Sequence, residues 1–243
     1  MNREILRLAV PNIISNLTVP LLGVVDTALM GHAPNKAHLG AIAVGSMIFN
    51  FLYWGFGFLR MGTTGLTAQA YGQDDHATVI SLLSRAVLTA LVASLLLILL
   101  QVPIVEAAFW LVESSAEVEA FGRNYFGIRI YAAPATIALY AFYGWFMGMQ
   151  NSRYVLIVSL AANLTNVVAN VALVYGLGYQ SGGIALGTLI AQSAGLIVAI
   201  GLFLNKYRAY LGHLQWEAVM QVKAIRRFFA VNGDIFIRTL CLI

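Results

Sequence analysis

The sequence predicts an all-α membrane protein, because the chain consists mainly of long apolar runs and carries few charges. Of the 243 residues, 60% are hydrophobic and only 10% are charged, whereas about a quarter of the residues in a soluble domain are charged. Six runs reach the length of about 20 apolar residues that a membrane-spanning helix needs. The net charge of +4 is scattered between these runs, so the expected partner is a lipid bilayer and not a nucleic acid.

The predicted spans alternate with short breaks rich in glycine, proline, asparagine and aspartate, which are typical turn residues. The second run is longer than a bilayer is thick, so we expect its helix to tilt or to project beyond the membrane. The third run is the most uniform and is uncharged from Ala86 to Leu100. In chain order, the six spans cover residues 8–31, 40–70, 77–104, 122–147, 154–177 and 183–204, and a seventh begins near Asp234.

The first span contains one ionisable residue, Asp26, with no other charge between Arg7 and Lys36. A carboxylate at membrane depth costs about 2.5–3.5 kcal/mol, so such a group is expected to face a cavity and to have a function. Pro11 and Pro20 can each kink this helix, because proline removes a backbone hydrogen bond. The apolar run is too long for a signal peptide, which predicts a retained first helix.

The distribution of lysine and arginine predicts a cytoplasmic N-terminus, with the protein in the cytoplasmic (inner) membrane. This orientation places nine basic residues in the cytoplasm and three outside, in agreement with the positive-inside rule. Three units follow: a six-helix transmembrane lobe over residues 1–204, a cytoplasmic linker over 205–232 and the start of a seventh helix over 233–243. Between residues 213 and 230, basic and apolar residues at helical intervals predict an amphipathic interfacial helix, with an ordinary solvated linker as the alternative.

The fifth and sixth predicted spans each carry a polar stripe along one helical face. Lipid does not tolerate such faces, so we expect them to meet each other and the first helix, or to line a shared wet cavity. Asparagines can also simply hold membrane helices together, and a threonine can satisfy itself on its own helix. Arg60, in the second span, can snorkel, pair with an acid or bind a carbonyl at a helix break. The stripes consist of Asn163, Asn166 and Asn170 in the fifth span and of Thr188 and Gln192 in the sixth.

The other chemistry-bearing residues predict neither an enzyme nor a metal site. The four histidines have no metal-ligand spacing, and the chain has no catalytic triad, phosphate loop or nucleotide-binding fingerprint. A single buried acid lacks the partner that acid–base catalysis requires. We therefore expect no cofactor.

Four segments, residues 8–32, 58–72, 163–170 and 231–240, carry a familiar pattern. The first reads LAVPNIISNLTVPLLGVVDTALMGH and the second FLRMGTTGLTAQAYG. These segments resemble the multidrug and toxic compound extrusion (MATE) transporters, most of all their DinF (DNA-damage-inducible F) branch. The resemblance implies a secondary antiporter that expels small organic, often cationic, compounds in exchange for protons or sodium ions. Family members have twelve helices in two lobes, so the chain corresponds to the N-terminal lobe and the C-terminal lobe is its implied partner.

The resemblance also implies roles for individual residues. Asp26 matches the acidic residue whose protonation or cation binding is coupled to export, and Asn166, Asn170 and Thr188 match polar positions near it. Several relatives have an aspartate where this chain has Asn170, so a single carboxylate favours proton coupling, although asparagine carbonyls can still ligate Na⁺. Two alternatives stay open: a lipid-linked oligosaccharide flippase of the same superfamily, and a half-protein that does not transport.

Overall fold

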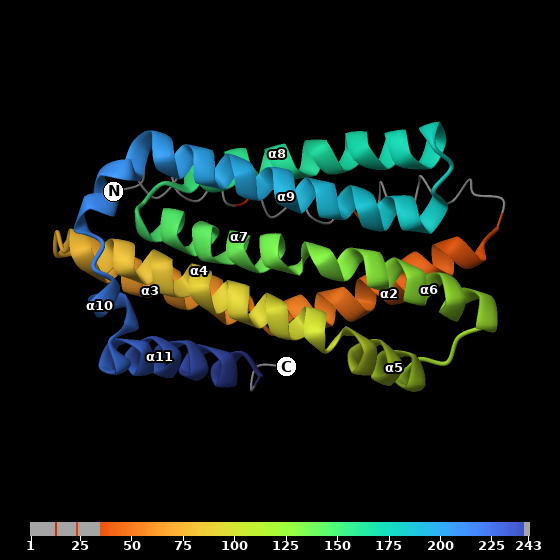
Figure 1. Ribbon diagram of the computed structural model, residues 1–243, viewed down its shortest axis with the longest axis horizontal. Helices are drawn as coiled ribbons and strands as arrows, with labels where there is room; N and C mark the ends of the chain where they lie inside the picture. Colours follow the sequence, from red (N-terminus) through yellow and green to blue (C-terminus); the bar gives the residue numbers. More distant parts are fainter. Residues whose placement is uncertain (1–12, 14–22, 24–34, 241–243) are drawn as a thin grey trace.

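The computed structural model describes Ile13, Gly23 and residues 35–240 of the chain. All regular secondary structure in this part is helical, which confirms the all-α prediction. The long helices lie roughly side by side along the longest axis of the molecule (Figure 1). Asp26, Pro11 and Pro20, all in the predicted first span, lie outside the described residues.

The described elements follow one another with short connections. In chain order they are α2 (Ala37–Trp54), α3 (Gly57–Gly72), α4 (His76–Leu99), α5 (Gln101–Leu111), α6 (Ala116–Arg129), the 3₁₀ turn η1 (Ile130–Ala132), α7 (Ala133–Gly148), α8 (Ser152–Val171), the π-helical turn η2 (Ala172–Gly176), α9 (Gln180–Tyr207), the 3₁₀ segment η3 (Arg208–His213), α10 (Trp216–Met220) and α11 (Val222–Leu240).

Five stretches of the described chain are long and apolar enough to cross a membrane, and they match the second to sixth predicted spans. They are Ala37–Gly72, His76–Leu99, Ala116–Gly148, Ser152–Gly176 and Gln180–His213. The first of the five is interrupted at Gly55 and Phe56, where α2 gives way to α3. Because residues 8–31 fall almost wholly outside the described part, the total of six spans stays a prediction.

Two prolines explain helix breaks that the apolar pattern did not predict. The predicted third span, residues 77–104, is wrong at its end, because α4 stops at Leu99 and a new helix, α5, follows. A proline ring clashes with the carbonyl four residues earlier, and for Pro103 this is the carbonyl of Leu99. Pro134 acts in the same way on the carbonyl of Ile130, where α6 gives way to η1 and then to α7.

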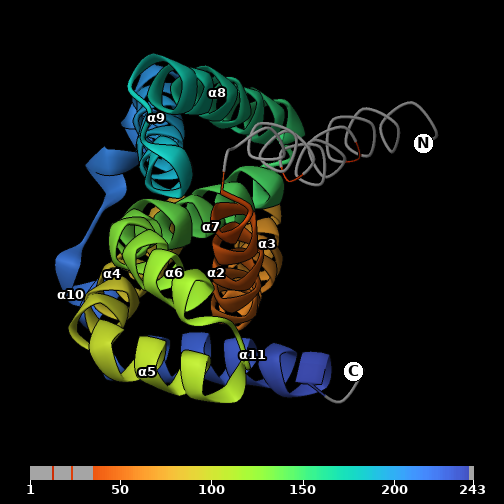
Figure 2. The same cartoon turned by 90° about the vertical axis from the view of Figure 1, so that its right-hand side faces the viewer.

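Viewed end-on, the helices form a pair, α8 and α9, stacked on the remaining bundle, with α5 and α11 on the far side (Figure 2). Helix α7 lies in the centre, and its Trp145 is fully buried. The Trp145 indole donates Nε1–H to the Val79 carbonyl of α4 at 3.0 Å. It also meets the rings of Phe203 and Tyr207 of α9 edge-on at 5.5 and 5.0 Å. Trp145 therefore joins three helices at the core.

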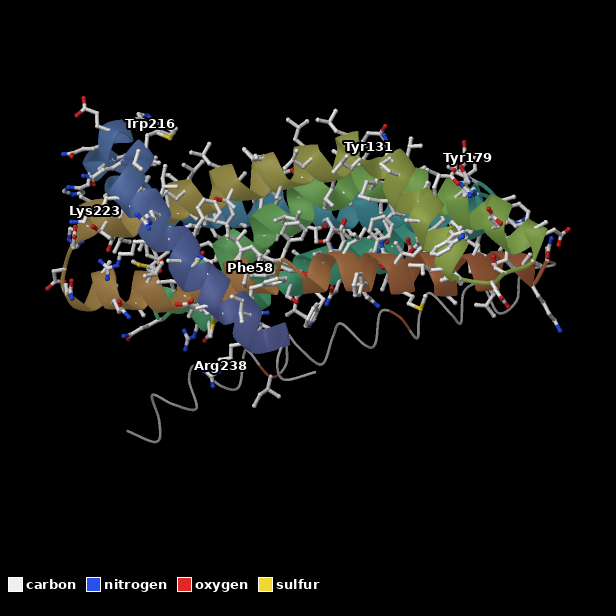
Figure 3. All side chains as sticks on the ribbon, turned by 90° about the horizontal axis from the view of Figure 1, so that it is seen from below. Phe58, Tyr131, Tyr179, Trp216, Lys223 and Arg238 are labelled. Atoms are coloured by element: carbon white, nitrogen blue, oxygen red, sulfur yellow. The ribbon has the colours of Figure 1, made fainter. Side chains whose placement is uncertain are left out.

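The predicted interfacial helix over residues 213–230 is wrong as a single element. Helix α10 ends at Met220, Gln221 interrupts the chain with an extended conformation, and α11 then runs unbroken to Leu240. Helix α11 crosses α3 diagonally, over the segment that contains Phe58 (Figure 3). The rings of Phe58 and Phe236 meet edge-on at 5.9 Å. The predicted start of the seventh helix at residue 233 therefore falls inside a helix that is already packed on the bundle.

Candidate functional site

The polar stripes of α8 and α9 meet in a chain of hydrogen bonds. Asn170 and Asn166 are four residues apart, so their side chains stack on one face of α8. Nδ2 of Asn170 donates to Oδ1 of Asn166 at 3.1 Å, and Nδ2 of Asn166 donates to Oγ1 of Thr188 at 3.4 Å. The Thr188 hydroxyl then donates to the carbonyl of Ile184 at 2.9 Å, within its own helix. We call Asn170, Asn166 and Thr188 the amide chain.

The amide chain is buried between two closely packed helices. Asn166 is 5% exposed and Asn170 is not exposed at all. The closest approach is at Gly187 of α9, where a Cβ atom would lie 1.8 Å from Oδ1 of Asn170 and 3.2 Å from its backbone nitrogen. A second close approach lies two turns further along α9, where a Cβ on Gly195 would lie 3.0 Å from Cβ of Ala162. Glycine at position 187 is therefore what allows the amide of Asn170 to fit.

Sequence reasoning did not identify Gly187, although a signal for it exists. Small residues recur every fourth position along α9, and this spacing lets membrane helices approach closely. The small residues are Gly183, Gly187, Ala191, Gly195 and Ala199, and all five are buried.

The direction of the hydrogen bonds determines what the amide chain can bind. Each member of the amide chain donates a hydrogen bond to the next one, starting at Asn170 and ending at the backbone carbonyl of Ile184. The acceptor at the other end is therefore the carbonyl oxygen of Asn170, Oδ1. A carbonyl oxygen can accept a hydrogen bond from a protonated carboxylic acid or ligate a hard cation. This oxygen offers nothing to an ionised carboxylate, which can only accept and would have to bind the second N–H of an asparagine amide instead.

The remaining candidate residues of the stripes lie beside the amide chain. Asn163 is half-buried one turn before Asn166, and Gln192 is half-buried one turn after Thr188. Arg60 lies on α3, with its guanidinium 5.8 Å from the ring centre of Tyr143 on α7.

A second polar cluster surrounds Arg129 at the end of α6. The Nη1 atom of Arg129 donates to Oγ of Ser46 at 3.1 Å and to the hydroxyl of Tyr125. The guanidinium also lies 4.9 Å from the ring centre of Phe49, which is a cation–π distance. Arg129 thus connects α6 to α2 and shares none of its contacts with the amide chain.

Metal binding finds no support in the described part of the chain, which has no group of three or more histidine, cysteine, aspartate or glutamate side chains placed to hold an ion. The members of the amide chain are neutral, so the site as described can offer only hydrogen bonds and carbonyl oxygens.

Comparison with known proteins points to one family. Residues 11–172 match the MatE family. The DNA damage-inducible protein F of Escherichia coli is 40% identical over 99% of this chain and 52% of its own length. A probable multidrug resistance protein, NorM, of Thermotoga maritima is 24% identical over 80% of this chain and 43% of its own length. The chain thus spans about half the length of the relatives it matches or less.

Solved structures share the fold. A crystal structure of a MATE protein in the bent conformation superimposes with a TM-score of 0.84 at 16% identity, over 98% of this chain and 53% of that one. An outward-facing multidrug resistance MATE family transporter gives a TM-score of 0.80 at 16% identity, over 93% of this chain and 49% of that one. In both, the matching region is about half of the longer chain.

Proposed function

Because the chain belongs to the MatE family, we propose that it forms the N-terminal lobe of a secondary multidrug efflux antiporter. The complete transporter would sit in the cytoplasmic membrane, with the N-terminus of this chain in the cytoplasm. It would expel small organic, often cationic, compounds in exchange for H⁺ or Na⁺. Multidrug resistance proteins among the relatives support the substrate class, and the five apolar spans support the location.

The observation that carries the coupling mechanism is the amide chain. We propose that Asp26 meets the acceptor end of this chain at Oδ1 of Asn170. A protonated Asp26 could donate a hydrogen bond there, whereas an ionised Asp26 could not. The contact would therefore favour the neutral acid and raise its affinity for a proton. Protonation from the outside would then change the contacts of the first helix and expel the substrate.

Proton coupling is favoured over sodium coupling because the amide chain is neutral. Na⁺ would find one carboxylate, Asp26, and amide or hydroxyl oxygens from Asn166, Asn170 and Thr188. Hard cations bind most tightly where several carboxylates converge. With a single carboxylate the site would bind a proton well and bare Na⁺ weakly.

The test begins with the reading frame beyond the codon for Ile243, which establishes the product to be assayed. Efflux of a fluorescent organic cation from cells that express that product is then compared with efflux by its Asp26→Asn variant. We expect Asp26→Asn to abolish efflux driven by a pH gradient. The matched control is Glu113→Gln, which also removes one carboxylate but at an exposed position.

Two outcomes would overturn the proposal. Efflux that keeps its pH dependence in the Asp26→Asn variant would exclude Asp26 as the coupling residue. Binding of lipid-linked pyrophosphates in place of organic cations would favour a flippase instead.

A further inference from the structure

A separate cavity, with both apolar and polar lining, lies at the end of the bundle where the linker packs against α3 and α4. It has a volume of about 370 Å³, which falls within the range of about 300–1,000 Å³ for ligand pockets. Its walls come from the end of α3, the start of α4, helix α10 and the start of α11. Helix α10 lies at the same end as the α3–α4 turn, opposite the α8–α9 connection (Figure 1). The cavity is therefore distinct from the amide chain.

The charges around this cavity are mainly positive. Arg85, Lys223 and Arg227 line it, together with one carboxylate, that of Asp75. The Asp75 carboxylate caps α4 by accepting a hydrogen bond from the backbone N–H of Thr78 at 3.0 Å. The cavity also adjoins the N-termini of α4 and α11, which are the positive ends of the helix dipoles. An anion placed there would be attracted by the N-terminus of α11 and by three cationic side chains, whereas the N-terminus of α4 is already capped by the Asp75 carboxylate.

Arg85 also builds one wall of the cavity. Its Nε atom donates to the carbonyl of Val219 at 2.9 Å, and its Nη2 atom donates to the carbonyl of Ala218. Val219 and Phe228 are buried beneath this wall, with exposures of 0% and 2%. The guanidinium therefore holds α10 against α4 and keeps the cavity formed.

A buried hydroxyl supplies independent evidence for a ligand. Ser81 lines the cavity, is 2% exposed, and its Oγ atom has no hydrogen-bond partner among the described residues. A buried polar group without a partner costs about 1–3 kcal/mol, so a bound group would be expected to satisfy it. The amides of Gln69, Gln73 and Gln221 lie in the same lining. Cationic groups combined with neutral donors are the set that binds phosphate oxygens.

Exposed apolar residues near this lining indicate that the anion belongs to a lipid. Met220 and Val222 adjoin the lining residue Gln221 along the chain, and Trp216 lies two residues before the lining residue Ala218. Trp216, Met220 and Val222 are 59%, 60% and 79% exposed. Trp216 and Lys223 lie at the same end of the molecule (Figure 3), as tryptophan and lysine commonly do at a membrane–water interface. Basic pockets between membrane helices on the cytoplasmic side are suited to anionic headgroups.

We propose that this cavity binds the phosphate headgroup of an anionic phospholipid in the leaflet next to α10. With the N-terminus in the cytoplasm this is the cytoplasmic leaflet. The phosphate would lie between Lys223 and Arg227 and accept a hydrogen bond from Ser81. The acyl chains of the lipid would pass beside the exposed apolar residues Trp216, Met220 and Val222. The site is independent of efflux, so its failure would leave the coupling proposal untouched.

Native mass spectrometry of the purified chain tests this directly. The chain is offered phosphatidylglycerol and phosphatidylcholine with identical acyl chains, and the bound lipids are counted. We expect one phosphatidylglycerol to be retained in preference. The double variant Lys223→Gln/Arg227→Gln should bind it about thirty-fold more weakly, on the scale of the attraction of two basic side chains to an anionic leaflet. Ser81→Ala, which keeps all charges, should weaken binding about fivefold or more.

The matched control is Arg208→Gln/Arg226→Gln, which removes two exposed charges from the same region without touching the lining. Equal losses in both double variants, or no preference for phosphatidylglycerol, would overturn the proposal. Glycerophosphoglycerol is added as a soluble headgroup, and inorganic phosphate as a free anion. Full displacement of the lipid by millimolar inorganic phosphate would assign the cavity to a soluble anion and would also overturn the lipid proposal. Circular dichroism confirms that each variant is folded.

Discussion

Replacing Gly187 by alanine tests whether the amide chain depends on the close approach of α8 and α9. The added methyl group would lie 1.8 Å from Oδ1 of Asn170 and 3.2 Å from its backbone nitrogen. The first distance is far inside van der Waals contact, so the amide of Asn170 must rotate or the helices must separate. Rotation would break the 3.1 Å hydrogen bond to Asn166.

The expected loss of folding stability follows from these two responses, rotation of the amide and separation of the helices. Overpacking a closely packed site costs about 1–3 kcal/mol, and a hydrogen bond between membrane helices contributes about 0.6 kcal/mol on average and about 1.7 kcal/mol at most. Alanine also favours the helix over glycine by about 1 kcal/mol. Gly201→Ala measures that gain separately, because nothing lies within 4 Å of a Cβ at position 201 of the same helix. We therefore expect Gly187→Ala to be about 1–3 kcal/mol less stable than Gly201→Ala.

The assay is reversible unfolding in mixed detergent micelles, followed by tryptophan fluorescence. A double-mutant cycle with Asn170→Ala identifies the cause, because truncating the amide removes the atom that the methyl group would meet. If the clash is with Oδ1, the double variant is more stable than the sum of the two single changes by about 1–2 kcal/mol. Additive effects, or equal stabilities of Gly187→Ala and Gly201→Ala, would refute the role of Gly187.

Three further predictions concern the linker, the start of α4 and the coupling site. Arg85→Gln removes two charge-assisted hydrogen bonds to α10, which should lower the free energy of local opening of the linker by about 1.5–3 kcal/mol. Tryptic cleavage after Lys223 should therefore be about ten- to 150-fold faster. Asp75→Ala should destabilise the folded chain by about 0.5–2 kcal/mol at pH 7. Hydrogen bonds from Thr78 hold the pKa of Asp75 below its ordinary value of 3.8. The contribution of Asp75 to stability is therefore complete above pH 3.8 and is lost as the pH falls through the lowered pKa. The difference in stability between Asp75→Ala and the parent should vanish at still lower pH, and a difference that stays constant with pH would contradict the assignment. Asn170→Asp should make Na⁺ raise the thermal unfolding midpoint where it has no effect on the parent, because in the proposed coupling site it adds a second carboxylate to that of Asp26.

The sequence could predict features that depend on spacing within one helix. Three asparagines at helical intervals placed their amides on one face of α8, and Asn166 and Asn170 do stack and bond there. The bond from Asn166 to Thr188 also follows the expectation that the two polar stripes meet. The hydroxyl of Thr188 also donates to a carbonyl of its own helix, as expected of a threonine that only packs, and this bond coexists with the hydrogen bond from Asn166.

Features that depend on how two helices approach each other could not be predicted in the same way. Gly187 allows the close packing of α9 against Asn170, and the spacing of polar residues along one helix carries no information about the distance to another helix. The sequence shows Arg85 only as a basic residue inside an apolar run, whereas its guanidinium donates to two carbonyls more than 130 residues away in the chain. The helix break at Leu99 does not show in the apolar pattern, which continues through Pro103; it follows from the steric effect of the proline ring on the preceding turn.

The positions of neutral and charged groups in the described spans follow from the cost of desolvation. Within the α8–α9 pair, the buried amides of Asn166 and Asn170 are hydrogen-bonded to each other and carry no charge, so burying them brings no ionic desolvation penalty. Arg60 and Arg129, which lie within apolar spans, are each placed over an aromatic ring, and this contact offsets part of the cost of removing water. Around the cavity beside α10, three cationic side chains gather at one end of the bundle. A proton-coupled acid is best placed against the neutral amide chain, since a nearby arginine would hold the acid ionised. An anionic headgroup is best placed against the cationic side chains of the cavity beside α10.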